Sequence, residues 1–236
     1  MTGEIFRTGS LDMPSVPFGV TADAVSWSGC TANRIVVAAA VILILIDLLD
    51  LLSIMPAIIH CLRTSRGAGS LEHSISVARS RNISAAVLLV AFLLMADRFG
   101  LYGARFLSAM PFGTSLAALT GIAAAFLGVR ALMHGLVKPA RFGAEDRQAL
   151  KRLPYTIFIP LVIMMLVTTG LCVVFDMPED AIRNILNIEI IASFCFSTIR
   201  AGQILAANCN GFSTILYLCA LELLPAALLV ASAVIL

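Results

Sequence analysis

The sequence predicts an all-α membrane protein, folded as a single bundle of about six transmembrane helices. Sixty per cent of its 236 residues are hydrophobic and 13% are charged, which is about half the charged share of a soluble domain. The mean hydropathy of the chain is +0.99. The apolar residues also gather in runs of about 20, the length with which an α-helix crosses a bilayer. We therefore expect the lipid bilayer to surround the protein.

Six segments satisfy this length and composition. They lie at about 35–60, 83–103, 112–135, 155–175, 181–200 and 212–235. Residues 1–33 are rich in Gly, Ser, Pro and Thr, which predicts an irregular N-terminal tail with Trp27 at the membrane surface. Residues 34–236 are expected to form one transmembrane domain, because no connection between segments is long enough for a soluble one.

The first three segments carry features beyond their hydrophobicity. Asp47 and Asp50 interrupt the first, and Pro56 predicts a kink near its end. Residues 71–82, before the second, are expected to form a solvated loop or a short basic helix on the membrane surface. In the third, small residues recur every four positions, a spacing that lets two helix backbones approach closely in lipid: Gly113, Ala117, Gly121 and Ala125, with Gly128 nearby. We expect this stripe to pack inside the bundle, with a homodimer contact as the alternative.

The last three segments are interrupted by prolines and acids. Pro160 lies in the fourth, and the acidic turn at 176–180 suits the N-terminus of the fifth. The fifth is the least apolar of the six and contains Glu189. The sixth contains Glu222 near its centre, with Pro225 three residues later.

The basic residues predict the orientation of the bundle. The connections at 61–82 and 136–153 hold four and five Lys or Arg residues, and Arg130 and Arg200 lie at the same side, so that eleven of the 16 are on one side. The positive-inside rule then places both connections in the cytoplasm. Both termini are expected in the periplasm.

Five charged residues within the apolar segments form a candidate intramembrane polar site: Asp47, Asp50, Arg130, Glu189 and Glu222. A charge inside the bilayer costs about 2.5–3.5 kcal/mol on insertion scales, so such residues usually face the bundle interior and have partners.

Helix geometry gives the depth of these residues. A rise of about 1.5 Å per residue places Asp47 roughly 18 Å below the outer surface and Glu222 roughly 14 Å from the inner one, both near the midplane. Asp50 lies about one turn deeper than Asp47, and the two share one helix face. At that depth Arg130 could contact Asp50 across a helix interface. The functional interpretation is a proton or cation relay, or a polar substrate pocket, built from the three acids. The structural interpretation is that each acid is neutral or paired and holds two helices in register.

Other chemistry finds little support in the sequence. The chain contains no HExxH, GxSxG or P-loop motif, and its six cysteines form no CxxC pair. His134, near the inner end of the third segment, is interpreted as a lone histidine rather than a ligand. We therefore predict no catalytic residue, no metal and no cofactor. The net charge of +2 also argues against nucleic acid as a partner.

The stretch ILYLCALELLP at 215–225 resembles the closing signature of an uncharacterised bacterial inner-membrane family, a domain of unknown function typical of Bacteroidota. The residues that carry the resemblance are Tyr217, Cys219, Glu222 and Pro225. The segment FIPLVIMM at 158–165 and the turn that follows are similar to the same family. The resemblance implies a compact inner-membrane protein of a Gram-negative bacterium. It brings no established reaction. Members of the family are often encoded near a uroporphyrinogen synthase gene, so the resemblance also implies a link to haem supply.

Three functions remain open. The first is a non-enzymatic membrane component or scaffold, which assembles as a homo-oligomer or with a membrane complex. The second is a small ion-coupled transporter that uses Asp47, Asp50 and Glu222. The third is a haem-linked membrane protein.

Overall fold

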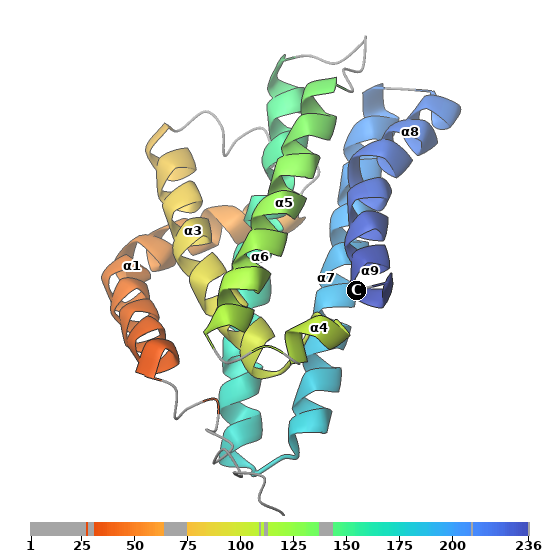
Figure 1. Cartoon of the computed structure of the whole chain (residues 1–236). Coiled ribbons are helices and arrows are strands. Elements are labelled where there is room, and N and C mark those ends of the chain that lie inside the picture. The colour runs from red at the N-terminus through yellow and green to blue at the C-terminus, as the bar shows by residue number, and fades with distance from the viewer. Residues whose placement is uncertain are drawn as a thin grey trace, which may run out of the picture.

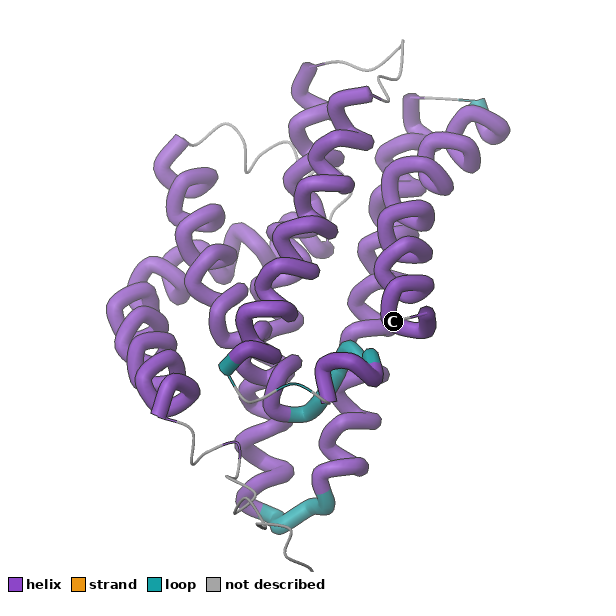
Figure 2. The backbone as a smooth tube through the Cα atoms, viewed as in Figure 1, coloured by secondary structure: helices purple, strands orange, loops and turns teal. Residues whose placement is uncertain are grey.

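The computed structural model describes Trp27 and residues 31–63, 75–108, 110, 113–136, 144–208 and 210–235. The regular elements among these residues are all helical, as Figure 2 shows. Six helices are long and apolar enough to cross a membrane: Thr31–Leu62, Val77–Arg98, Thr114–Leu136, Leu150–Val174, Glu179–Ala207 and Gly211–Val234. The predicted all-α fold with six membrane spans is confirmed. Most of the expected N-terminal tail, 1–33, lies outside the described residues.

The elements follow the chain in a simple order. They are α1 (Thr31–Arg63), α3 (Ile75–Arg98), α4 (Arg105–Ser108), α5 (Thr114–Leu136), α6 (Ala144–Val174), α7 (Glu179–Asn208), α8 (Gly211–Leu218), the π-helical turn η2 (Cys219–Leu223) and α9 (Leu224–Ile235). Several helices are longer than their apolar runs. Residues 75–82 are the first turns of α3, not a loop or a separate surface helix, and α6 begins inside the expected connection 136–153.

α1 changes direction partway along its length. In Figure 1 its first part stands beside α3, and its last part runs across the bundle. Pro56 lies within the helix and removes one backbone hydrogen bond. One turn earlier the Ser53 hydroxyl donates to the Asp50 carbonyl at 2.7 Å, a contact that also favours bending. The Arg200 guanidinium of α7 donates to the carbonyl of Leu62. The bend therefore carries the end of α1 as far as α7.

Three clusters of buried side chains form the core of the described bundle. The smallest joins α3 to α5 and contains Leu93, Ala96 and Leu119. The other two both include side chains of α6. The larger lies where α1, α3, α6 and α7 meet, and its most buried members are Ile54, Ile58, Leu88, Ile159, Val162, Met165 and Leu186. The smaller joins α6 and α7 to η2 and contains Leu150, Leu153, Ile157, Ala201, Leu205 and Leu221. The smaller cluster holds the π-helical turn against the rest of the bundle.

The stripe of small residues on α5 does not pack inside the bundle. Ala117, Gly121, Ala125 and Gly128 are all exposed, and a Cβ added at Gly121 or Gly128 would meet no atom within 4 Å. The expectation of internal packing is therefore wrong. Within this chain the stripe is an outer surface of α5, and a homodimer contact there stays a prediction.

Candidate functional site

The last membrane span widens at Glu222. The N–H of Leu224 donates to the carbonyl of Cys219, five residues back, where a regular α-helix would use Ala220. Pro225 follows directly, and a proline has no N–H to offer the carbonyl four residues earlier and crowds that turn with its ring. One wider turn accommodates this clash, and such π-turns recur at functional sites. Leu221 and Glu222 are each only 2% exposed, so the turn presents a carboxylate to the interior.

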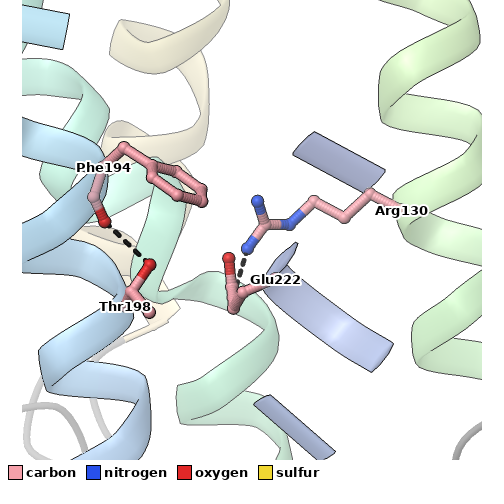
Figure 3. A network of polar contacts seen from close by, with 4 residues as sticks. All are labelled: Arg130, Phe194, Thr198 and Glu222. Atoms are coloured by element: carbon pink, nitrogen blue, oxygen red, sulfur yellow. Dashed lines mark hydrogen bonds and ion pairs between the residues drawn. The ribbon is translucent and has the colours of Figure 1, made fainter. Parts of the chain in front are cut away.

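Arg130 of α5 supplies the partner of that carboxylate. Its Nη2 lies 2.5 Å from Oε1 of Glu222, and the two side chains are 13% and 2% exposed. Figure 3 shows Arg130 extending from α5 toward the π-helical turn. A hydrogen bond with charge on both partners is about twice as strong as a neutral one. The pair therefore joins α5 to the last membrane span inside the bundle.

The second oxygen of Glu222 has no such support. Oε2 is buried and, among the described residues, has no hydrogen-bond partner. Thr198 of α7 lies on the other side of Glu222 from Arg130 in Figure 3, but its hydroxyl donates to the Phe194 carbonyl at 2.9 Å. An unsatisfied buried acceptor costs about 1–3 kcal/mol. Oε2 is thus the point of the pair at which a proton or a polar group would be accommodated.

His134 lies one helical turn from Arg130 on α5. Residues four apart share a helix face, so its ring lies on the same side of α5 as the ion pair. Its Nε2 is buried, and no partner for it is found in the part of the chain that the structure describes. The sequence analysis set this histidine aside as a lone residue. The structure adds it to the neighbourhood of the site, because a second unsatisfied polar atom lies within one turn of Arg130.

Two of the other acids of the candidate site, Asp47 and Asp50, lie far from this pair in the fold. Asp47 is 6% exposed and Asp50 is exposed, both on α1. That helix packs against α3 and α6, whereas η2 packs against α5, α8 and α9. Figure 1 shows the first part of α1 on one side of the bundle and the last span on the other. The structure therefore does not bring the three acids together.

Two narrower expectations about these residues are wrong. Arg130 pairs with Glu222 and not with Asp50. Asp47 and Asp50, although three positions apart, do not share one environment, because the first turns inward and the second outward. Positions three apart differ by about 60° around a helix axis, which here is enough to bury one carboxyl group and expose the other.

Glu189 forms a separate polar contact between α6 and α7. Its Oε1 accepts a hydrogen bond from the Thr168 hydroxyl at 2.6 Å. Its Oε2 is buried without a partner among the described residues. This carboxylate links two neighbouring helices, as the structural interpretation expects.

The four residues of the family-like stretch have different surroundings. Tyr217 packs against the cluster that contains Leu221, and Glu222 and Pro225 are buried. Cys219 is exposed. Three of the four thus build the interior side of the widened turn.

A polar cluster at the end of α3 was not predicted from the sequence. The Trp27 Nε1 donates to Asp97 Oδ2 at 2.7 Å, and the Arg98 guanidinium lies 5.9 Å from the Trp27 ring centroid. Arg98 also pairs with Glu179 of α7 at 2.5 Å. The sequence does contain an indication of this cluster. Asp97 and Arg98 are adjacent at the end of an apolar run, and the chain has a single tryptophan that could pair with them. The cluster ties Trp27 to α3 and, through Arg98, to α7.

Among the described residues, no group of three or more His, Cys, Asp or Glu side chains is arranged to hold a metal ion. No protein-family model, curated protein or solved structure gives a significant match to the chain.

Proposed function

We propose that this multi-pass membrane protein is a non-enzymatic component of the membrane, a helical scaffold in which buried charges hold helices together. The observation that carries the proposal is the Arg130–Glu222 ion pair. It gives the midplane carboxylate of the last span a fixed partner. The acid that was expected to share its site, Asp47, lies in a different helix interface.

The position of the pair explains what it does for the fold. α5 contacts the last span at η2 and α9, and its outer face is exposed. In lipid, helices associate through packing and polar contacts rather than the hydrophobic effect. A charged pair between α5 and η2 fixes which turn of one helix faces which turn of the other. Glu189 and Thr168 do the same for α6 and α7.

A second candidate, a proton-coupled carrier, rests on one specific observation. Oε2 of Glu222 and Nε2 of His134 are both buried and have no partner in the described part of the chain. Two titratable groups beside one arginine would form the start of a proton path. This version of the carrier uses Glu222 and His134 and leaves out the acids of α1.

Proton flux separates the two functions. Purified protein is reconstituted into vesicles containing a pH-sensitive dye, and the flux is measured under an imposed pH gradient and membrane potential. The scaffold predicts the same flux as in empty vesicles, for the wild type and for Glu222→Gln alike. A flux that the wild type carries and that both Glu222→Gln and His134→Ala abolish contradicts the scaffold and supports the carrier.

We also propose the cellular setting that the sequence analysis expects: the inner membrane of a bacterium, with both termini in the periplasm. The distribution of Lys and Arg supports this orientation. In Figure 1 the end of α5 and the start of α6 lie at the opposite end of the bundle from the turn between α6 and α7. Labelling of single cysteines with an impermeant reagent tests it. Cysteines in the turn at 175–178 should react in intact spheroplasts, and those at 144–149 only after lysis.

Membership of the uncharacterised Bacteroidota-type family is a further proposal, supported by Tyr217, Cys219, Glu222 and Pro225. Three of these positions lie together at the π-helical turn, since Glu222 and Pro225 are buried there and Tyr217 packs against the cluster that contains Leu221. A deletion strain with normal haem levels would remove the implied link to haem supply and leave the scaffold unaffected.

A further inference from the structure

The first part of α1 presents an apolar face to the outside of the bundle. Ile42, Ile46 and Leu49 are 57%, 73% and 78% exposed. Asp50 and Ser53 continue the same face toward the bend and are exposed too. The spacing of these five positions, i, i+4, i+7, i+8 and i+11, is that of one side of a helix. A face of this kind normally meets lipid, but this one contains a carboxylate.

The position of Asp50 makes lipid an unfavourable neighbour. Counted from the start of the apolar run, Asp50 lies roughly 22 Å below the outer surface at about 1.5 Å per residue, still inside a hydrocarbon layer about 30 Å thick. Its carboxylate has no ion-pair or hydrogen-bond partner among the described residues. The Ser53 hydroxyl donates to the backbone carbonyl of Asp50 and not to its carboxylate. A carboxylate in lipid is unfavourable and calls for a cation.

The described residues of a second copy of this chain are a poor source of that cation. Of the described cations that lie deep in the spans, Arg130 is held by Glu222, and Arg200 by the carbonyl of Leu62. Arg81 is 2% exposed and faces the interior. The described cations that are exposed lie near span ends: Arg34, Arg79, Lys151 and Arg183.

We propose that this face of α1 docks a transmembrane helix of another protein, one that carries a Lys or Arg at the depth of Asp50. The apolar positions supply the packing surface, and the acid selects the partner by charge. The inference rests on the proposed function, because it names the kind of partner that the scaffold holds. A partner without the cation gains only packing, so the charge decides specificity.

The test uses the full-length protein in lipid vesicles and two synthetic helices as probes. Each probe is a fluorescent Leu/Ala transmembrane peptide, identical except for a single Lys or a Leu at the level of Asp50. Energy transfer from a label on the protein reports binding. We expect the Lys peptide to bind about tenfold more tightly than the Leu peptide. Asp50→Leu should remove this preference, while the matched control Asp176→Asn, which alters an exposed acid in the turn after α6, should keep it.

Two results overturn the proposal. Equal binding of the two peptides to the wild type means that Asp50 does not select a cation. Energy transfer between two labelled copies of the protein, lost in Asp50→Leu, assigns the face to a second copy instead. The proton-flux measurement reports independently on the scaffold, so a failure of docking and a failure of the proposed function are distinguishable.

Discussion

Breaking the Arg130–Glu222 pair from one side should destabilise the bundle strongly. The two groups lie 2.5 Å apart, and the side chains are 13% and 2% exposed, so neither has much access to water. Removal of one partner from a buried pair leaves the other charge uncompensated and costs about 3–5 kcal/mol. We therefore expect Glu222→Gln and Arg130→Gln each to lower the free energy of unfolding by about that amount.

Replacing both groups together should cost far less. Apolar substitution of a whole buried ion pair is often neutral or stabilising by about 1–4 kcal/mol. The variant Arg130→Met with Glu222→Leu keeps similar volumes and removes both charges. We expect its free energy of unfolding to lie within about 1 kcal/mol of the wild type or above it. The losses of the two single variants add up to about 6–10 kcal/mol from the same range. We expect the double variant to show almost none of this loss.

The assay is an unfolding titration with a denaturing detergent in mixed micelles, followed by circular dichroism at equilibrium. Glu179→Gln is the control, because its partner Arg98 is 37% exposed and Glu179 is 67% exposed. An exposed pair is worth only about 0–1 kcal/mol. Single variants of the buried pair that cost no more than Glu179→Gln would refute the reasoning, as would a double variant whose cost equals the sum of the single ones.

Three other changes test neighbouring parts of the account. Pro225→Ala removes the cause of the wide turn, so Glu222→Gln should cost at least about 1 kcal/mol less in that background; an unchanged cost would separate the turn from the ion pair. Thr168→Val leaves Glu189 without its donor and should cost about 1–3 kcal/mol in the same titration, with Thr168→Ser as the conservative control; equal stability of both would show that the contact is dispensable. Asp97→Ala removes the acceptor of the single tryptophan, so iodide should quench its fluorescence more strongly than in the wild type, and unchanged quenching would contradict the contact.

The membrane spans could be predicted from the sequence because the requirement for them is local. A run of about 20 apolar residues is sufficient to cross the bilayer, whatever its neighbours are. Some helices continue beyond the apolar run, as at the start of α6 and the end of α7. There the hydrophobic pattern does not indicate where the helix begins or ends. The bend of α1 was predictable from Pro56, but its destination against α7 was not.

The candidate site was predictable as a set of residues and not as a set of contacts. Glu222 and Arg130 stand out because charges are rare in apolar segments. Which two meet depends on which helices are neighbours, and the sequence does not contain that information. Depth alone placed Arg130 near Asp50, yet α5 lies beside the last span and makes contact with η2. His134 was missed because a lone histidine is only informative once its buried, unpaired nitrogen is seen.

The charge on Glu222 is the most direct test of the central claim, that this acid is held by Arg130 as a fixed link between α5 and the last span. Infrared difference spectra of the protein in lipid, wild type minus Glu222→Gln at neutral pH, distinguish an ionised carboxylate from a protonated carboxyl group. The ion pair predicts a carboxylate band in the wild type that disappears in the Arg130→Gln background. A carboxylic acid band in the wild type, unchanged by Arg130→Gln, would contradict the pairing and would support proton transfer through Glu222.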